Sequence, residues 1–339
     1  MIMVKRHSYI LLYGCLLLYA KIHFFEPFLS PANILILRSQ PKGTYVSQST
    51  TEICMETTRG LTGKGVGVAV LDTGCFPHED FSGRIAAFRD LIGGRREPYD
   101  DNGHGTHVCG IIAGNGCAAG GEHCGLAPCA HLIPVKVLDR RGSGFASDVH
   151  AGLRWVRENQ ERYQIRIVNI SVGSFSRRNM GENSALVRSV NDAWDAGLVV
   201  VVAAGNMGPK TGTITTPGIS RKVITVGCSD DDKEVTVMGS RMIDYSGRGP
   251  TGSCVCKPDI VAPGASIISC SNKNGRYTSK SGTSMATPYV SGALALLLEQ
   301  HPELSNRDVK LWLRERAVDL GLPHNQQGWG LLDLGELLR

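Results

Sequence analysis

Three side chains that could cooperate in nucleophilic chemistry each lie close to a glycine. The first is Ser284, in the stretch 281–288 (Ser-Gly-Thr-Ser-Met-Ala-Thr-Pro), which leads into the apolar run 290–298. Gly282 permits a tight turn, and the helix expected to follow directs unpaired N–H groups toward the serine. The same stretch also fits a serine N-cap without chemistry. Whether Ser284 is a nucleophile or only part of a helix cap therefore depends on whether a base and an acid lie elsewhere in the chain.

A histidine and an aspartate supply those two groups. His104 stands between two glycines in the stretch 101–108 (Asp-Asn-Gly-His-Gly-Thr-His-Val), which leaves its imidazole room to turn toward a partner. Asp72 ends the apolar stretch 70–74 (Val-Leu-Asp-Thr-Gly), where a partly buried carboxylate needs a partner. One acid, one base and one hydroxyl are the groups used in nucleophilic acyl transfer.

Other chemistries fit these residues less well. Asp-Thr-Gly is also the signature of aspartic proteases, but these need a second such motif, which the sequence lacks. His104 and His107 could be metal ligands three residues apart, or His107 could be a packed core histidine. A serine esterase of the α/β-hydrolase type needs Gly-x-Ser-x-Gly and the order serine, acid, histidine. Here Ala286 replaces the last glycine, and the order is acid, histidine, serine.

Alternating apolar strands and amphipathic helices define the fold class. The periodicity predicts strands over 66–71, 132–138, 165–171, 198–203 and 223–227, and helices over 104–113, 146–158, 185–196, 285–301 and 306–316. This alternation predicts one α/β domain with a mostly parallel central sheet and helices on both faces. In such sheets, sites form at the carboxyl ends of strands, and both Asp72 and Asn206 follow such ends.

Composition narrows the class of protein further. A chain of 339 residues with 42% hydrophobic content can bury a large core, so disorder is excluded as its main state. The net charge of +5 is spread without long basic blocks, which argues against a nucleic-acid-binding protein. No nucleic-acid partner is therefore predicted. The eleven cysteines are an odd number, and a chain of this size needs no disulfide framework, so they favour a reducing compartment.

A cysteine-rich stretch and the N-terminus leave alternatives open. Cys117, Cys124 and Cys129 lie near His123, but their spacing matches no paired Cys-x-x-Cys zinc pattern, so no metal is predicted there. The apolar run 9–20 follows two basic residues and has the shape of a signal peptide, although no small-x-small cleavage site follows. It is short for a membrane span. A signal, a membrane anchor and a docked segment all remain possible within a predicted extension over 1–54.

The three motifs, in the order Asp, His, Ser, resemble those of the subtilisin-like serine proteases, or subtilases, and most closely the bacterial intracellular type. The resemblance covers about residues 60–335 and implies a subtilisin-like fold in a single catalytic domain, residues 55–339. It implies a serine endopeptidase in which Ser284 is the nucleophile and His104 the general base and acid. Asp72 would hold the histidine tautomer and stabilise the imidazolium.

The resemblance also assigns the surroundings of the triad. Asn206 matches the side-chain donor of the oxyanion hole, with the Ser284 backbone N–H as the second donor. His107 matches a structural histidine, and Thr216-Pro217 a bond that is often cis. Segments expected to bind an extended polypeptide, from an unfolded protein or a loop, are Gly142, Ser143, Gly144, Ser171, Val172, Gly173, Ala203, Ala204 and Gly205.

Three departures from the family pattern carry expectations. Many subtilases bind calcium in the loop after the histidine helix, but residues 115–125 contain few carboxylates, so that calcium site is expected to be absent. No cofactor is expected to be required, and calcium binding stays open as an alternative. The segment before residue 55 is too short for a folded prodomain, which favours an intracellular or membrane-associated enzyme over a secreted one. Thr215 replaces a small residue near the primary specificity pocket. A catalytically silent subtilase is disfavoured because no triad position is replaced.

Overall fold

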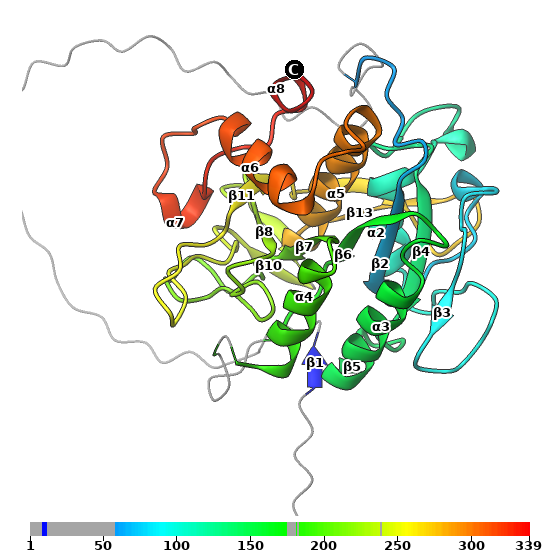
Figure 1. Ribbon diagram of the computed structural model, residues 1–339, viewed down its shortest axis with the longest axis horizontal. Coiled ribbons are helices and arrows are strands. Elements are labelled where there is room, and N and C mark those ends of the chain that lie inside the picture. The colour runs from blue at the N-terminus through cyan, green and yellow to red at the C-terminus, as the bar shows by residue number, and fades with distance from the viewer. Residues whose placement is uncertain (1–8, 12–57, 175–180, 182, 238) are drawn as a thin grey trace, which may run out of the picture.

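A seven-stranded parallel sheet forms the centre of the molecule. The computed structural model describes residues 9–11, 58–174, 181, 183–237 and 239–339. The strand order is β11-β8-β7-β6-β2-β4-β3, with every neighbouring pair parallel (Figure 1). The bounds are β2 (Gly67–Asp72), β3 (Arg89–Asp90), β4 (His131–Lys136), β6 (Ile165–Ile170), β7 (Val199–Ala203), β8 (Ile224–Cys228) and β11 (Ile260–Ala262).

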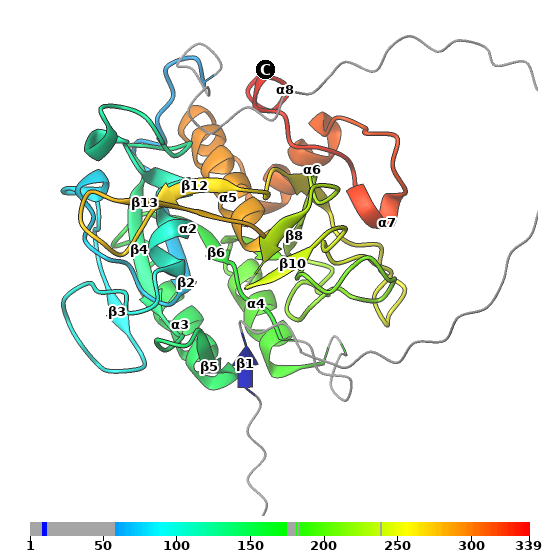
Figure 2. The ribbon, with the colours of Figure 1, turned by 180° about the vertical axis from the view of Figure 1, so that it is seen from behind.

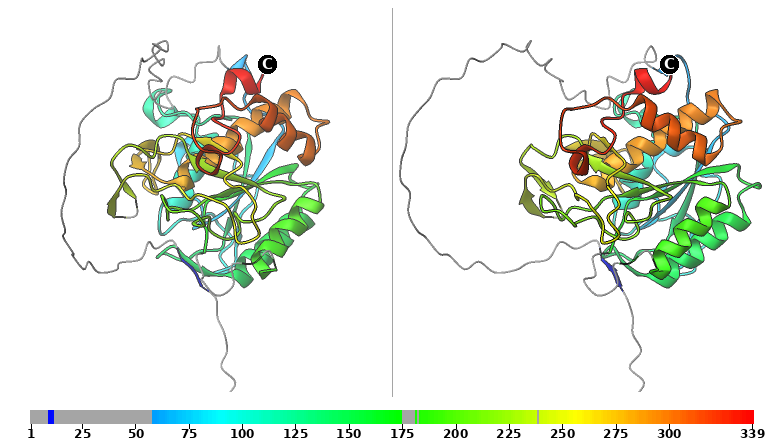
Figure 3. Two further views of the ribbon diagram at one scale, coloured as in Figure 1. Left: turned by 90° about the vertical axis from the view of Figure 1, so that its left-hand side faces the viewer. Right: turned by 60° about the vertical axis from the view of Figure 1, so that its left-hand side comes forward.

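Helices cover both faces of this sheet, as Figures 2 and 3 show from other sides. On one face α2 (His104–Ala113) packs against α5 (Thr283–Gln300), and on the other α3 (Ala146–Glu158) packs against α4 (Ala185–Asp195). The chain ends with α6 (Asn306–Arg316), α7 (His324–Gln327) and α8 (Leu334–Leu337). The predicted α/β fold with a parallel sheet and helices on both faces is confirmed.

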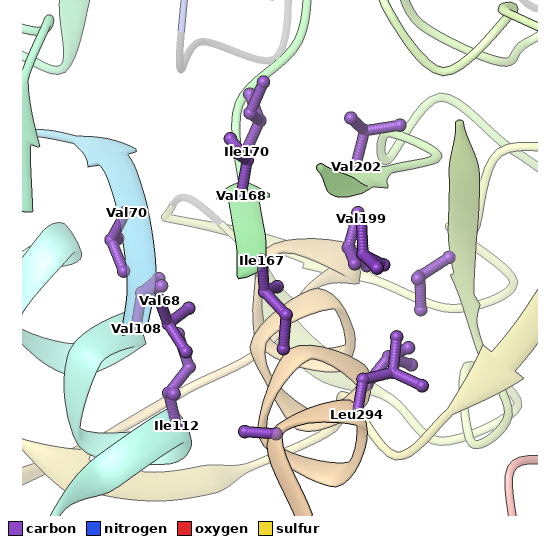
Figure 4. Close-up of a cluster of buried hydrophobic side chains, with 14 of the residues drawn as sticks. Val68, Val70, Val108, Ile112, Ile167, Val168, Ile170, Val199, Val202 and Leu294 are labelled. Carbon is purple, nitrogen blue, oxygen red and sulfur yellow. The ribbon is translucent and has the colours of Figure 1, made fainter. Parts of the chain in front are cut away.

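The core lies between the sheet and its helices. Because the sheet is covered on both faces, its central strands are mostly apolar, and the Val199–Ala203 strand is apolar and buried throughout. On the side of α2 and α5, Val68 of β2 lies near Val108 and Ile112 of α2, and Leu294 projects from α5 (Figure 4). This packing fixes the positions of the two helices that begin with the histidine and the serine motifs.

Short elements surround the sheet. The hairpins are β9 (Val235–Val237) with β10 (Ser240–Met242), and β12 (Ile267–Cys270) with β13 (Tyr277–Lys280). β1 (Tyr9–Leu11) pairs antiparallel with β5 (Ser143–Phe145). Two 3₁₀ turns, η2 (Glu79–Phe81) and η3 (Cys117–Ala119), lie beside each other. The sequence did not predict these elements, or β3 and β11 in the sheet.

The helix bounds agree closely with the prediction, with one correction. The helices over 104–113, 146–158 and 306–316 begin and end as predicted, and Ser305 is the N-cap of α6. A serine N-cap at the start of α5 was wrong, because the N-cap is Gly282 and no side chain caps it. Of the apolar run 9–20 only Tyr9–Leu11 is described, and residues 12–57 lie outside the described residues. Among the described helices, none has the length and hydropathy needed to cross a membrane.

Candidate active site

Asp72 and His104 form the buried end of the site. Asp72 ends β2 and is fully buried, and its Oδ1 and Oδ2 lie 2.8 and 3.0 Å from Nδ1 of His104. Asp72 Oδ1 also accepts a 2.7 Å hydrogen bond from the backbone N–H of Thr73. Because an ionised carboxylate only accepts, Nδ1 of His104 carries the hydrogen, and Nε2 holds a lone pair. The imidazole is therefore in the tautomer of a general base.

A second aspartate, which sequence analysis missed, positions the start of α2. Asp100 accepts hydrogen bonds from the backbone N–H groups of Asn102, Gly103 and Thr106, and from the hydroxyls of Thr73 and Thr106. Burial alone raises the pKa of this carboxyl, but these bonds outweigh burial and leave it below its usual value. Its place directly before the histidine motif, three residues ahead of Gly103, was the available signal. Asp100 holds the His104 backbone at the end of β2.

Ser284 lies in the first turn of α5 and lines a cavity together with His104. The backbone turn that leads into this part of α5 requires a glycine at position 282. Gly282 has a φ of 137°, which residues with a side chain rarely adopt. The Ser284 hydroxyl donates a 2.7 Å hydrogen bond to the carbonyl of Ser171. Between these two described side chains, the structure has no Ser284–His104 hydrogen bond. Both nevertheless line one cavity of about 400 Å³ together with Asn206, so rotation of the serine side chain redirects its hydroxyl within the cavity.

The hydrogen bonds around Asn206 fix the orientation of its amide. Asn206 Oδ1 accepts bonds of 2.9 Å from the Thr283 N–H and 3.0 Å from the Thr283 hydroxyl. Since a backbone N–H can only donate, the atom facing Thr283 must be the oxygen, and Nδ2 is left as a donor. An ideal Cβ placed on Gly282 would be 3.1 Å from Nδ2, so this donor lies at the turn before Ser284.

Two of the segments expected to bind substrate meet at Thr215. Ser171, Val172 and Gly173 follow β6, and Ala203, Ala204 and Gly205 close β7 and the turn after it. A Cβ on Gly173 or on Gly205 would lie only 2.4 Å from atoms of the Thr215 side chain. Thr215 therefore fills the space between the two glycines. The Thr216–Pro217 peptide bond next to it is cis, as the resemblance implied.

The third segment expected to bind substrate, residues 142–144, is paired in part with the antiparallel strand β1. Gly142, Ser143 and Gly144 precede and enter β5, and Gly144 lies so close to the Val137 carbonyl that a Cβ would be 2.2 Å from it. Ser143 and Gly144 are register partners of Leu11 and Ile10 in β1. The edge of this segment that pairs with β1 is therefore one that accepts an extended chain in antiparallel register.

His107 faces away from the triad. Its Nε2 lies 3.1 and 3.0 Å from the carbonyls of Ile267 and Thr278, which fastens α2 to the β12–β13 hairpin. Burial, aided by the positive charge of Lys280, lowers the pKa of His107 to about 3. Because His104 binds Asp72 and His107 binds these carbonyls, the two histidines share no ligand position. This arrangement agrees with a structural role for His107.

The cavity is positively charged. Arg141 and Lys280 line it together with His104 and Ser284, and no carboxylate is among its described lining residues. Both charges therefore act on a chain that crosses the cavity.

Comparison with known proteins identifies the family. The sequence pattern described as "Subtilase family" matches residues 63–330. The chain belongs to the subtilase family. AprX, a serine protease of Bacillus subtilis, is 45% identical over 271 residues, which span 75% of this chain and 61% of AprX. Subtilisin Savinase of Lederbergia lenta is 38% identical over 275 residues, spanning 81% of this chain and 91% of Savinase.

A solved structure supports the same assignment. The crystal structure of a cold adapted subtilisin-like serine proteinase superposes with a TM-score of 0.64 at 32% sequence identity, covering 80% of this chain and 91% of that one. The predicted subtilase family and subtilisin-like fold are therefore confirmed. This subtilase spans less than two thirds of the length of AprX.

Proposed function

We propose that this subtilase is a serine endopeptidase that cleaves peptide bonds through an acyl-enzyme. The observation that carries the proposal is the bidentate contact of Asp72 with Nδ1 of His104, which leaves Nε2 as a base in the cavity that also contains Ser284. Family membership supports it, because the relatives compared above are named serine proteases or a subtilisin.

The chemistry proceeds in two halves. His104 Nε2 removes the proton of the Ser284 hydroxyl as the oxygen attacks the substrate carbonyl carbon, which forms a tetrahedral intermediate. The imidazolium then gives that proton to the departing amine, and an ester remains on Ser284. Water repeats the sequence with the same base and frees the acid product. Asp72 stays ionised and stabilises the imidazolium formed in each half.

The oxyanion is stabilised by two donors. Nδ2 of Asn206 is the free donor of an amide whose oxygen is held by Thr283. The Ser284 backbone N–H belongs to the first turn of α5, where N–H groups have no partner within the helix. Donors fixed in advance toward the developing charge lower the barrier because they need no reorganisation during the reaction.

The substrate lies as an extended chain across the cavity. We assign it to the edges of Gly142–Gly144 and Ser171–Gly173, with Ala203–Gly205 lining the primary pocket. The pairing of β1 with Ser143 and Gly144 supports this assignment, because it places an extended segment on that edge. Extended binding requires a flexible substrate, which favours unfolded proteins and loops.

A fluorophosphonate probe tests the function directly. The folded, purified chain is incubated with the probe, and the modified peptide is mapped by mass spectrometry, alongside casein cleavage. We expect one label, on Ser284, and casein fragments. A folded sample that does not react would instead support a catalytically silent subtilase. Turnover of small esters without peptide hydrolysis would support an esterase.

A further inference from the structure

A buried lysine lies beside the strand that ends with the catalytic aspartate. Lys136 ends β4, is the register partner of Asp72 in β2, and is fully buried. Its Nζ donates three hydrogen bonds, of 2.5 Å to the Thr73 carbonyl, 2.8 Å to the Leu138 carbonyl and 2.7 Å to Asp101 Oδ1. Three acceptors satisfy every N–H of an ammonium group. Lys136 therefore places a charged ammonium between the backbone that follows β2 and the backbone that follows β4, although it takes no part in the proposed peptidase chemistry.

Thr73 connects this ammonium to the catalytic pair. Its carbonyl accepts the bond from Lys136, and its backbone N–H donates to Oδ1 of Asp72. Its hydroxyl donates to Asp100 and accepts from the Gly105 N–H in the first turn of α2, with both bonds 2.9 Å long. Thr73 is therefore held at its carbonyl, its N–H and its hydroxyl. A displacement of this residue would move both the Asp72 carboxylate and the start of α2, which carries the catalytic imidazole.

The charge of Lys136 is balanced differently from that of Lys257, the other buried lysine among the described residues. Lys257 pairs with Asp259, whose side chain is 8% exposed, so both charges of that pair lie in the interior. The side chain of Asp101, the partner of Lys136, is 43% exposed. Water and salt therefore screen the Asp101 carboxylate much more than the buried ammonium. A positive charge remains in effect at the buried end of the pair, on the side of the catalytic aspartate.

We propose that Lys136 is a positioning residue for the Asp72–His104 pair and that its charge helps to set the lower pH limit of peptide cleavage. The proposal rests on the peptidase function proposed above. Through the Thr73 carbonyl, the ammonium holds the backbone that orients the Asp72 carboxylate, without touching the substrate. Its positive charge opposes protonation of the nearby imidazole, because like charges repel.

Other charged groups surround the same imidazole. Three carboxylates, from the end of β2 and the loop before α2, favour its protonated form: Asp72, Asp100 and Asp101. Three cations oppose protonation: Lys136, Arg141 and Lys280. His107, on α2, adds no charge near neutral pH, because burial lowers its pKa to about 3. Of the three cations only Lys136 is fully buried, so solvent screens its charge least.

The pH dependence of kcat/KM tests the effect of the charge, because it reports the ionisation of the free enzyme. Lys136→Met removes the charge and keeps most of the side-chain volume, so it should move the acid limb of the profile to higher pH by about 0.5–1 pH unit. Asp101→Asn keeps an acceptor for Lys136 but removes the opposing charge, so it should move the acid limb to lower pH. A lysine that only supports the fold would not produce shifts in opposite directions.

Separate values of kcat and KM test the positioning. With a chromogenic peptide, and at the optimum pH of each enzyme, Lys136→Met should lower kcat by about 10–100-fold with little change in KM, because the substrate does not contact this lysine. Asp195→Asn is the matched control, since Asp195 pairs with Lys222 at the end of α4 and is 50% exposed. The control should keep the kcat and the pH profile of the parent chain.

The activity of the parent chain separates this proposal from the peptidase function itself. A folded parent without activity would overturn both. An active parent whose profile coincides with those of Lys136→Met and Asp101→Asn, or two shifts of the same sign, would overturn the role of Lys136 alone. Circular dichroism establishes that each variant is folded. If Lys136→Met does not fold, Asp101→Asn, at its partly exposed position, decides the question: an acid limb at lower pH supports the proposal, and an unmoved or raised limb contradicts it.

Discussion

At the scale of single residues, the Asn206 amide is the group whose effect on catalysis is best defined by its contacts. Thr283 holds its oxygen, so its nitrogen is the atom available to an oxyanion. Asn206→Leu should therefore lower kcat by about 10²–10³ with little change in KM, a magnitude measured in another subtilase. Steady-state kinetics on a chromogenic peptide measure both constants. An Asn206→Leu variant with the same kcat as the parent would contradict the assignment of Asn206 to the oxyanion hole.

We expect Thr215 to limit the size of the primary pocket. Its side chain fills the space between Gly173 and Gly205, so the pocket should accept small side chains before the scissile bond. Thr215→Gly should raise the ratio of kcat/KM for a phenylalanine peptide over an alanine peptide by about 10–100-fold. Peptide pairs that differ at that one position measure the ratio. The exposed Thr211→Gly is the matched control, and an equal shift in both variants would contradict the assignment.

The residues that sequence analysis identified differ in kind from those it missed. Asp72, His104 and Ser284 stand in motifs whose glycines and helix starts are local requirements of the chemistry, so the motifs predict them. Asp100 became evident only from the five donors that the fold places around it. One of these donors, the Thr73 hydroxyl, comes from a separate segment of the chain, and no local pattern encodes its approach to Asp100.

At the scale of elements, the pairing of β1 with β5 has a kinetic consequence. Tyr9–Leu11 lies on the edge that we assign to the substrate, so the two compete for Ser143 and Gly144. A chain that lacks residues 1–11 should have a KM for an extended peptide that is lower by up to about tenfold, with kcat unchanged, because more of the enzyme is free to bind. A chain that lacks only residues 1–8 is the control. The same KM in both would show that β1 does not compete.

The elements that were predicted are those with a clear internal period. The 3.6-residue pattern of α3 and the capped start of α6 placed both helices correctly. Short strands such as β3 and β11 have two or three residues, too few to show a pattern, and they form because a neighbouring strand supplies their hydrogen bonds. The strands of the β12–β13 hairpin, to which His107 is hydrogen-bonded, have four residues each and are likewise too short to show a pattern.

At the scale of the whole molecule, the buried His107 predicts sensitivity to acid. Its pKa is lowered from 6.5 to about 3 by burial, with the positive charge of Lys280 adding to the effect. The unfolded chain therefore takes up a proton below about pH 6.5 that the folded chain does not, and stability falls as the pH drops from about 6.5 toward 3. The titration of His107 alone should lower the free energy of unfolding by about 2 kcal/mol between pH 7 and pH 5.

Urea unfolding of the Ser284→Ala chain at several pH values measures this loss. His107→Gln removes two hydrogen bonds and lowers stability at every pH, so the readout is the slope against pH and not the absolute value. The slope between pH 6.5 and pH 5 should be shallower in His107→Gln. Equal slopes in the two chains would show that another group controls the acid sensitivity.

The charge of the cleft makes a further prediction about substrates. Arg141 and Lys280 line the cavity, and no described lining residue opposes them with a carboxylate. Peptides with acidic residues beside the scissile bond should be cleaved faster than matched basic peptides, most clearly at low salt. Lys280→Ala should reduce this preference several-fold in kcat/KM. A preference that is unchanged by both Lys280→Ala and added salt would contradict this account.

The central claim is that Ser284 is the nucleophile of a peptidase, and one comparison tests it most directly. Initial rates of casein hydrolysis are measured for the parent chain, for Ser284→Ala and for Ser147→Ala, an exposed serine of α3. We expect the Ser284→Ala rate to fall by about 10⁴-fold or more, with Ser147→Ala equal to the parent. Casein hydrolysis at the parental rate by folded Ser284→Ala would contradict the claim.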